Sequence, residues 1–362
     1  MTRCVVVGAG IVGMLTAREL LLAGCDVTVV ERGQPGRESS WAGGGILSPL
    51  YPWRYPDSVS ELARWGQQRY ANLCEALEQS SGVDPQWTRN GMLLTDCDEA
   101  AAAGAWAERF SARLESVDPG QAKRLEPQLG PDIDSVLWMP EVAQVRNPRL
   151  AQALRISLEQ GGVAMLTDCP ALEWKRDAGR ISGLRTAAGD LEADLFVVAT
   201  GAWTSGLLEP TGLRLPIEPV RGQMILFRGP PELLKRITLC RGHYVIPRRD
   251  GRVLVGSTLE YVGFDKQTTA EALTQLKQAA FDLAPALGNL PVELHWAGLR
   301  PGSPSGVPVI GAHPEISNLF VCAGHFRNGV VLAPASARLA ADLMLGREPD
   351  LEPSDYDPVR LG

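Results

Sequence analysis

The sequence has few of the residues that bind metals or form disulfide frameworks. Only four of its 362 residues are histidines, and none is spaced from another as metal ligands usually are. Its cysteines are odd in number and scattered, and no pair has the Cys-x-x-Cys spacing. This pattern is typical of reduced thiols, so we expect a cytoplasmic protein without a bound metal. The cysteines are Cys4, Cys25, Cys74, Cys97, Cys169, Cys240 and Cys322.

The chain also lacks an excess of positive charge and long hydrophobic runs. It has 35 Lys and Arg against 42 Asp and Glu, a net charge of −7, whereas a protein that binds nucleic acid needs a basic face. Arg18, Glu19 and Asp26 interrupt the longest apolar stretches, so none reaches the roughly 20 residues that span a bilayer. The chain enters a strand directly after Met1, so we expect no leader peptide. We therefore expect neither nucleic acid nor a membrane as partner.

The first thirty residues have the pattern of a dinucleotide-binding unit. Residues 3–7 are a β-branched run of the kind buried in parallel sheets, and residues 26–30 are a second such run. Between them, residues 11–23 have the pattern of a helix that Gly24 ends. A strand, a helix and a parallel strand in this order predict a Rossmann-like fold.

A Gly-x-Gly-x-x-Gly turn joins the first strand to this helix. Gly8 permits the tight turn, Gly10 lets a pyrophosphate approach the backbone, and Gly13 lets helix and strand pack closely. The helix N-terminus offers free N–H groups to the phosphates. Glu31, 18 residues after Gly13, can accept hydrogen bonds from a ribose. The turn alone is also compatible with no ligand, but in this context it predicts a dinucleotide.

Three further segments favour FAD over NAD. Residues 39–47 form a loop of small residues that suits backbone contact with a flat ring. Residues 199–203 end a buried strand with a glycine, and residues 324–329 lead into the last helix. The dipole of that helix can stabilise negative charge on a reduced flavin ring.

The remaining pattern alternates between cofactor-type strands and hairpins. We expect helices at 59–78 and at 148–160, the latter with Asn147 as N-cap, and a hairpin that turns at Asp250-Gly251. The fold class is therefore α/β and α+β: a Rossmann-like FAD-binding domain with an inserted antiparallel-sheet substrate domain. We assign residues 1–83, 145–212 and 300–362 to the FAD-binding domain, and 84–144 and 213–299 to the substrate-binding domain. Other expected strands are 91–95, 136–139, 195–200, 224–228, 244–248 and 319–323, with a final helix to about 345.

Six motifs resemble the D-amino-acid oxidase family, most closely its glycine oxidase branch, which serves thiazole synthesis in thiamine formation. The resemblance extends from Cys4 to about Gly346 and implies a homotetramer. The motifs are Gly8-Ala-Gly-Ile-Val-Gly13, Ser40-x-Ala-Gly-Gly44, Ala199-Thr-Gly-Ala-Trp203, Tyr244-Val-Ile-Pro-Arg248, Trp296-Ala-Gly-Leu-Arg-Pro301 and Gly324-His-Phe-Arg-Asn-Gly329.

The resemblance implies that Tyr244, Arg300 and Arg327 surround the carboxylate of an amino-acid substrate. A planar guanidinium binds a carboxylate with two parallel hydrogen bonds, and a tyrosine hydroxyl can donate a third. Thirty of the 35 basic residues are Arg, so a surface role is the alternative for either arginine, and Tyr244 could be a core aromatic. His243 points to the other face of its strand and is expected to be structural. His325 has no identifiable acidic partner, so we expect no protein acid or base in catalysis.

The expected cofactor is non-covalent FAD, since Cys322 lies inside an apolar strand. The residues expected to contact it are Gly8, Gly10, Ile11, Val12, Gly13, Glu31, Arg32, Ser39, Ser40, Gly43, Gly44, Gly45, Ile46, Leu47, Ala171, Thr200, Gly201, Trp203, Arg300, His325, Phe326, Arg327, Asn328, Gly329 and Val330.

The expected reaction is oxidative deamination of an amino acid by hydride transfer to flavin N5, with oxygen reduced to hydrogen peroxide. Glycine, sarcosine and small D-amino acids remain open as substrates. Leu259, just after the hairpin, is expected to belong to the apolar lining that limits substrate size. The alternatives are a broader D-amino-acid or N-methyl-amino-acid oxidase, a dehydrogenase that passes electrons to a quinone, and a flavin-binding subunit active only with a partner.

Overall fold

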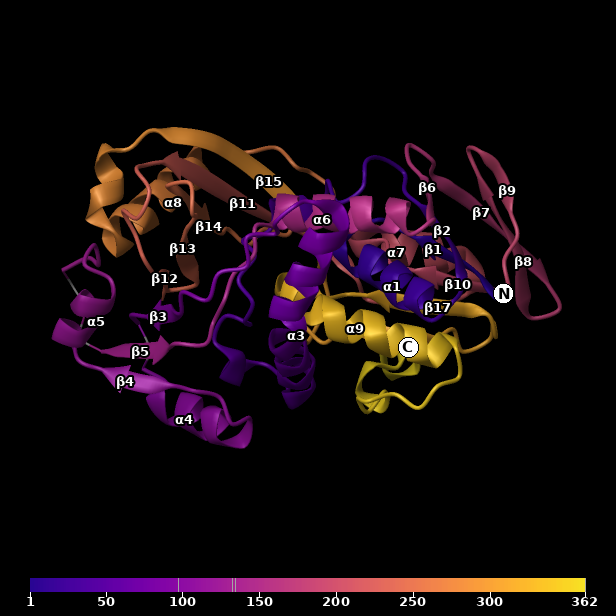
Figure 1. Cartoon of the computed structure of the whole chain (residues 1–362), viewed down its shortest axis with the longest axis horizontal. Helices are drawn as coiled ribbons and strands as arrows, with labels where there is room; N and C mark the ends of the chain where they lie inside the picture. Colours follow the sequence, from indigo (N-terminus) through magenta and orange to yellow (C-terminus); the bar gives the residue numbers. More distant parts are fainter. Residues whose placement is uncertain (97, 132, 134, 362) are drawn as a thin grey trace.

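The computed structural model of the chain contains two large sheets at opposite ends of an elongated molecule (Figure 1). It describes residues 1–96, 98–131, 133 and 135–361. Cys97, one of the expected thiols, lies outside the described residues. The other six cysteines are free.

The six-stranded sheet has the order β16-β17-β10-β1-β2-β6. Its central strand β1 (Arg3–Val7) runs parallel to β2 (Asp26–Val30) and β10 (Leu195–Val198). Most residues of these three strands are buried, as their largely apolar sequences predict. The carboxyl ends of β1, β2 and β10 therefore meet at one edge. The outer strands are β6 (Ala164–Leu166), β17 (Leu319–Ala323) and the antiparallel β16 (Val309–Ala312).

Both faces of this sheet are covered. A small antiparallel sheet covers one face, where Trp174, Ile181 and Leu184 pack against Phe196 and Val198. Helices cover the other face with a continuous hydrophobic core. These helices are α1 (Ile11–Leu22), α3 (Asp57–Ser81), α6 (Asn147–Gln160) and α9 (Gly329–Met344). The small sheet consists of β7 (Ala171–Asp177), β8 (Arg180–Thr186) and β9 (Gly189–Leu191).

The eight-stranded sheet has the order β15-β11-β14-β13-β12-β3-β5-β4, and only β12 and β3 pair in parallel. The hairpin predicted at Asp250-Gly251 is confirmed, since it joins β13 to β14 and Gly251 has a φ of +85°. Helix α8 (Ala270–Leu283) covers one face of the sheet. The strands are β3 (Met92–Leu94), β4 (Glu115–Val117), β5 (Val136–Met139), β11 (Glu218–Arg228), β12 (Ile237–Cys240), β13 (His243–Pro247), β14 (Arg252–Gly256) and β15 (Val292–Gly302).

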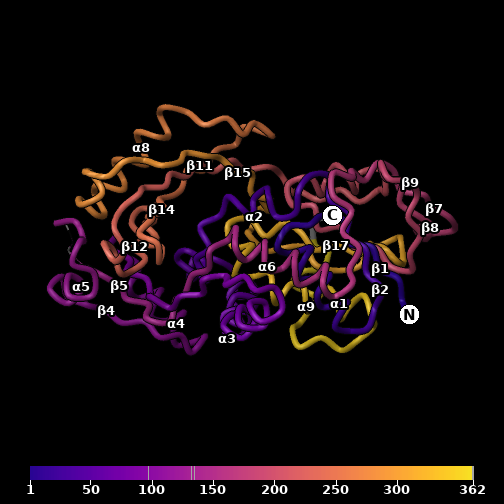
Figure 2. The backbone as a smooth tube through the Cα atoms, turned by 45° about the horizontal axis from the view of Figure 1, so that its top comes forward, coloured from indigo at the N-terminus to yellow at the C-terminus, as the bar shows by residue number. Residues whose placement is uncertain are grey.

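This architecture confirms the predicted fold class, a Rossmann-like unit joined to a largely antiparallel sheet. The tube in Figure 2 shows the two sheets at opposite ends from a second direction. The eight-stranded sheet takes strands from both ranges assigned to the substrate-binding domain, and β15 crosses the predicted boundary at 299/300. The boundaries themselves stay a prediction.

One predicted helix start is wrong by one residue. The first intrahelical hydrogen bond of α6 runs from the N–H of Leu150 to the carbonyl of Arg146, so Arg146 rather than Asn147 is the N-cap. The side chain of Asn147 instead packs against Gly43 and Gly45. Neither of its polar side-chain atoms has a hydrogen-bond partner among the described residues.

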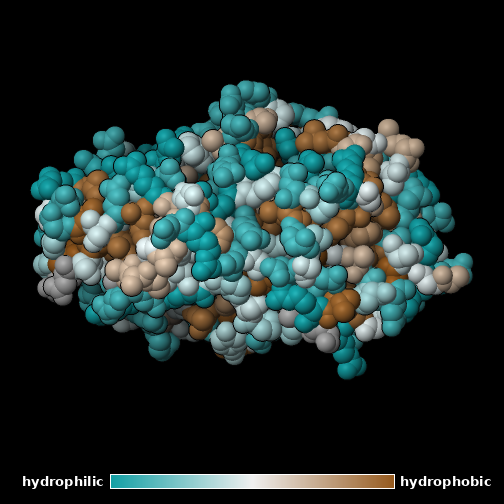
Figure 3. Space-filling model, turned by 90° about the horizontal axis from the view of Figure 1, so that it is seen from below, coloured by the Kyte–Doolittle hydropathy of each residue, from teal (hydrophilic) through white to brown (hydrophobic). Residues whose placement is uncertain are grey.

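On the surface shown in Figure 3, hydrophobic residues form separate groups among hydrophilic ones. Within the described part of the chain, no helix has both the length and the hydrophobicity to cross a membrane.

Candidate active site

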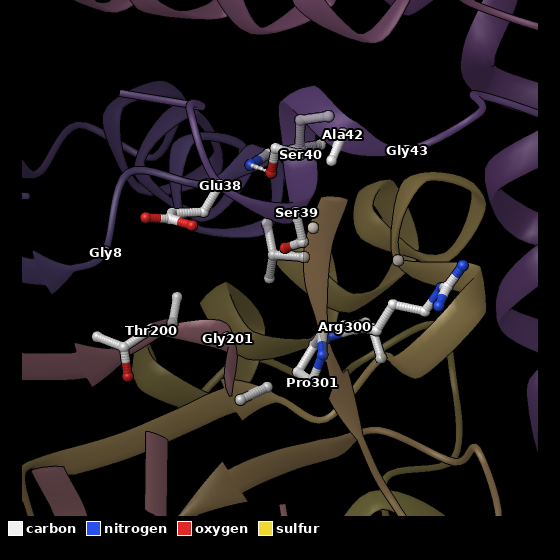
Figure 4. A pocket seen from close by; sticks show the side chains of 18 of the residues that line it. Gly8, Glu38, Ser39, Ser40, Ala42, Gly43, Thr200, Gly201, Arg300 and Pro301 are labelled. Atoms are coloured by element: carbon white, nitrogen blue, oxygen red, sulfur yellow. Dashed lines mark hydrogen bonds between the residues drawn. The ribbon is translucent and has the colours of Figure 1, made fainter. Parts of the chain in front are cut away.

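A cavity of about 510 Å³ runs from the carboxyl ends of β1, β2 and β10 to strand β15. Figure 4 shows Gly8 and Thr200 toward one side of this cavity and Arg300 and Pro301 toward the other, with Ser39 and Ser40 above Arg300 in this view. The cavity thus joins the glycine-rich turn to the predicted substrate residues.

The glycine-rich turn is packed too closely for any larger residue. Gly8 has a φ of +106°, and a Cβ there would lie 2.5 Å from the carbonyl oxygen of Ala199 at the end of β10. A Cβ on Gly13 would overlap the carbonyl oxygen of Gly8. Gly10 is the N-cap of α1, and the next N–H, that of Ile11, donates to Ser40 Oγ over 2.9 Å. Gly10, Ile11 and Val12 line the cavity, so the N-terminus of α1 opens onto it, as an anion site requires.

Glu31 lies beside this turn, at the end of β2. Its carboxylate accepts hydrogen bonds from the N–H groups of Ala9 (2.8 Å) and Gly33 (3.0 Å). These bonds hold the side chain in place and leave lone pairs that can accept from ribose hydroxyls. Arg32 lies 3.5 Å from the ring centroid of Trp203, so these two predicted residues form one wall of the cavity.

The loop at Gly43–Gly45 is held by a buried arginine. The guanidinium of Arg248 donates to the carbonyls of Gly44 (2.7 Å) and Val145 (3.0 Å) and to Oε1 of Gln144 (2.6 Å). Burial lowers the pKa of Arg248 to about 10. In the sequence, Arg248 is only the last residue of a motif, and nothing in the pattern indicates that it anchors this loop.

The end of β17 and the segment after it supply the opposite wall. Burial raises the pKa of the Cys322 thiol to about 12, and lowers the pKa of His325 to about 3. Both residues line the cavity, so at neutral pH they present a thiol and a neutral imidazole. His325 Nε2 and Asn328 Nδ2 are buried without a partner among the described residues.

These features fit FAD. The close backbone, the open helix end and the carboxylate of Glu31 suit the adenosine and pyrophosphate parts, and the unpartnered buried groups lie where polar ring atoms could bond to them. Gly13 and Leu47 lie outside the lining, since Gly13 packs on the turn and the Leu47 N–H bonds to the carbonyl of Ala143. The other predicted cofactor residues all line the cavity: Gly8, Gly10, Ile11, Val12, Glu31, Arg32, Ser39, Ser40, Gly43, Gly44, Gly45, Ile46, Ala171, Thr200, Gly201, Trp203, Arg300, His325, Phe326, Arg327, Asn328, Gly329 and Val330.

The structure brings Tyr244, Arg300 and Arg327 together at the far end of the cavity. Arg300 Nη2 donates to Ser257 Oγ over 2.6 Å, and its Nη1 donates to the carbonyl of Thr258 over 3.2 Å. Burial lowers the pKa of Arg300, and the charge of Arg327 lowers it further, against the influence of Tyr244. Neither arginine forms an ion pair with a carboxylate of the described residues. Two cations without a counterion suit an anionic substrate.

Sequence reasoning missed three residues at this end. Gly222 leaves the space that the Arg300 guanidinium fills, Ser257 supports that guanidinium, and the sulfur of Met224 lies 3.9 Å from the Tyr244 hydroxyl. All three line the cavity. Their positions follow from the pairing of β11 with β14 and β15, for which the sequence has no local signal.

A second cavity of about 520 Å³ adjoins the first, and both are lined by Ser257 and Arg327. His243 lies here, on the other side of β13 from Tyr244, and its Nε2 is 3.4 Å from Gln275 Nε2 of α8. Burial and the charge of Arg327 lower the pKa of His243. Leu259 lines this second cavity and not the first, so it lies beside the predicted substrate site rather than in its wall.

No group of three His, Cys, Asp or Glu side chains that could hold a metal ion occurs among the described residues.

Comparison with known proteins identifies similar chains. The profile of the family described as FAD dependent oxidoreductase matches residues 3–343. A glycine oxidase from Pseudomonas aeruginosa is 49% identical over 358 residues, covering 99% of this chain and 98% of the relative. A bifunctional protein ThiO/ThiG from Nostoc sp. is 32% identical, covering 97% of this chain and 54% of the relative. The crystal structure of glycine oxidase from Geobacillus kaustophilus superimposes with a TM-score of 0.94 at 27% identity, covering 99% of each chain.

Proposed function

Because this chain belongs to the FAD dependent oxidoreductase family, and is an FAD-dependent amino-acid oxidase within it, we propose that its substrate is glycine and its electron acceptor oxygen. Glycine would lose two electrons and two protons to become an imine, which water hydrolyses, and oxygen would become hydrogen peroxide. The extent and level of similarity to glycine oxidases support this assignment.

The observation that carries the proposal is the half-buried Arg300 guanidinium, which faces a cavity without a carboxylate partner among the described residues. Arg300 would bind the substrate carboxylate with two parallel hydrogen bonds, and the Tyr244 hydroxyl would donate a third. Arg327 adds a second positive charge. Fixing the carboxylate in this way fixes the direction of the α-C–H bond.

When bound, FAD supplies the electron acceptor that takes a hydride from the substrate and passes two electrons to oxygen. Glu31 and the α1 N-terminus would hold its adenosine and pyrophosphate, and the Gly43–Gly45 loop its flat ring. No side-chain base is needed, since the neutral amine lone pair drives hydride departure. His325 stays neutral in its buried position and would form a hydrogen bond instead of moving a proton.

A peroxide assay of the purified chain with glycine, sarcosine, D-alanine and D-proline, together with a flavin absorption spectrum, tests the proposal. We expect a yellow protein with its highest kcat/KM for glycine. A colourless protein that stays so with added FAD would contradict it. Activity of the purified chain alone would exclude a subunit that needs a partner, and electrons passed to a quinone but not to oxygen would identify a dehydrogenase.

The second candidate is an oxidase of broader range. The second cavity adjoins the substrate end through Ser257 and Arg327, so a larger amine or side chain would have space there. In the same assay, a higher kcat/KM for sarcosine or D-proline than for glycine would favour this candidate.

We further infer that the imine serves thiazole formation in thiamine synthesis. The ThiO/ThiG name of a relative that this chain matches over 97% of its own length supports this inference. Thiamine-dependent growth of a deletion strain, relieved by the gene for this chain, would test it. We also propose that the protein is a cytoplasmic homotetramer and that it binds FAD non-covalently. Light scattering of the purified protein would measure the mass of the assembly.

A further inference from the structure

The position of the Arg300 guanidinium depends on one short segment. Both of its hydrogen-bond acceptors, Ser257 Oγ and the carbonyl of Thr258, follow directly after β14. Residues 257–259 belong to no strand, but a backbone hydrogen bond of 3.3 Å, from the N–H of Thr258 to the carbonyl of Gln223, ties them to β11. Further contacts hold the segment in place.

Those contacts come from two polar side chains. Thr258 Oγ1 accepts from the backbone N–H of Gln223 over 2.8 Å and donates to Oε1 of Glu260. The same carboxylate oxygen accepts from Nε2 of Gln223 over 3.0 Å. Gln223 is fully buried. The Gln223 backbone and the Glu260 carboxylate therefore hold the Thr258 side chain together.

Arg221 in turn holds Glu260. The two residues exchange backbone hydrogen bonds of 2.8 and 3.0 Å, and the Arg221 Nε and Nη2 donate to Oε2 of Glu260 over 3.1 and 2.5 Å. Nη1 of Arg221 donates to Asp265 (2.6 Å) and to the carbonyl of Gln267 (3.0 Å). Arg221 itself is 5% exposed, whereas its partner Asp265 is partly open to solvent.

The second cavity contains another arginine to which Glu260 could bind. Glu260 lines the second cavity, as does Arg327, whose guanidinium has no carboxylate partner among the described residues. Without Arg221, the Glu260 carboxylate could turn toward Arg327 and form an ion pair with it. The Arg327 guanidinium would then be less available to the substrate carboxylate. Burial raises the pKa of Glu260, but hydrogen bonds from Thr258, Arg221 and Gln223 lower it more, so its pKa lies below the usual value. The carboxylate is thus ionised and able to compete.

We propose that Arg221 is a positioning residue for substrate binding. It holds Glu260, and through it Thr258, so that Arg300 points into the cavity and Arg327 stays free for the substrate carboxylate. The proposal rests on the proposed function, since it takes Arg300 to bind a carboxylate. Arg221 lines neither cavity, so it would touch neither a substrate nor a cofactor bound there.

The test compares Arg221→Gln with Arg252→Gln in the holoenzyme. Arg252, on β14 of the same sheet, also forms two ion pairs, with Asp250 (2.9 Å) and Glu293 (2.8 Å), and lines neither cavity. We expect Arg221→Gln to raise the KM for glycine about tenfold with kcat changed less than about threefold, and Arg252→Gln to leave KM unchanged. The double variant Arg221→Gln/Glu260→Gln should regain part of the loss, because the competing carboxylate is gone.

A second measurement does not depend on turnover. Acetate, a carboxylate without an amine, should bind Arg221→Gln about tenfold more weakly than wild type in calorimetry. If Arg221→Gln does not fold, the acetate measurement is made on Arg221→Lys instead. Lysine keeps the positive charge but lacks the planar guanidinium that forms parallel hydrogen bonds.

The proposal would be overturned if the Arg221 variant bound acetate as tightly as wild type and had the same KM for glycine. It would also be overturned if only kcat and flavin content fell while KM and acetate affinity stayed at the wild-type values. A double variant no better than Arg221→Gln would overturn the route through Glu260. A wild-type enzyme inactive on glycine would instead contradict the proposed function.

Discussion

The guanidinium of Arg300 occupies the space into which Gly222 would extend a side chain. A Cβ on Gly222 would overlap Nη1, Nη2 and Cζ of Arg300. The two residues lie on neighbouring strands, where Val220 of β11 is paired with Arg300 of β15. The absence of a side chain on β11 thus lets the Arg300 guanidinium reach Ser257 and the cavity.

We therefore predict that Gly222→Ala displaces Arg300. The KM for glycine should rise roughly tenfold or more, because a displaced guanidinium cannot form both bonds to the carboxylate. Overpacking should also lower the free energy of unfolding by about 1–3 kcal/mol. Gly104→Ala is the control, since this glycine of α4 (Ala100–Arg109) has open space around its Cβ position. A KM for Gly222→Ala equal to that of the control would exclude this role of Gly222.

The second prediction separates backbone strain from cofactor binding. Gly8→Ala should yield a protein without flavin, because its Cβ would push against Ala199 at the turn that receives the pyrophosphate. Gly189→Ala is a matched control: Gly189 has a similar φ of +114°, but no atom of the described residues lies within 4 Å of its Cβ position. Both variants should lose about 1 kcal/mol of stability from the backbone, yet only Gly8→Ala should lose the visible absorption of bound flavin. Full flavin content in Gly8→Ala would contradict the assignment of this turn.

The fold was largely predictable where strands are buried on both faces. Residues 3–7 and 195–200 are unbroken apolar runs, and such runs indicate parallel strands whatever their neighbours are. The sheet of β7–β9 was missed because its strands expose one face and carry charges such as Lys175 and Arg176, so they look like loops. Helix α8 was missed as well, although its buried residues Ala272, Leu276, Ala280 and Leu283 have the spacing of one helix face.

The site was predictable only in part. Its glycines and charged residues belong to local motifs, so Gly8, Glu31 and Arg300 could be named from the sequence. Gly222 acts through the pairing of β11 with β15. Arg221 acts through its contact with Glu260, in the segment that follows β14. No local pattern encodes such contacts between distant segments, because they depend on register, which only the folded sheet determines.

The third prediction concerns the attachment of the flavin. Burial raises the pKa of Cys322 to about 12, so at neutral pH its sulfur is a thiol and a poor nucleophile. Acid precipitation of the holoenzyme should therefore release all flavin into the supernatant, and Cys322→Ala should retain the same flavin content as wild type. Yellow colour that remains with the precipitated wild-type protein, but not with Cys322→Ala, would show covalent attachment.

The last prediction concerns His325 and acid stability. Burial lowers the pKa of His325 from its ordinary value of 6.5 to about 3. Between these two values the unfolded chain binds a proton at this position and the folded protein does not. The stability that this histidine contributes is thus fully present above pH 6.5, and it is lost as the pH falls toward 3. The loss should be about 1.4 kcal/mol per pH unit in that window.

His325→Gln removes this proton and keeps a polar side chain in the cavity wall. Urea unfolding at pH 6.5, 5.5 and 4.5 should show a stability that falls more steeply with pH in wild type than in the variant, by about one proton. All other titrating groups are the same in both proteins, so the difference in slope belongs to His325. Equal slopes would mean that the folded protein binds a proton at His325 as readily as the unfolded chain does. A protonated, accessible imidazole would then make an acid–base role for His325 in catalysis possible again, and a kcat that titrates near pH 6.5 in wild type but not in the variant would show it.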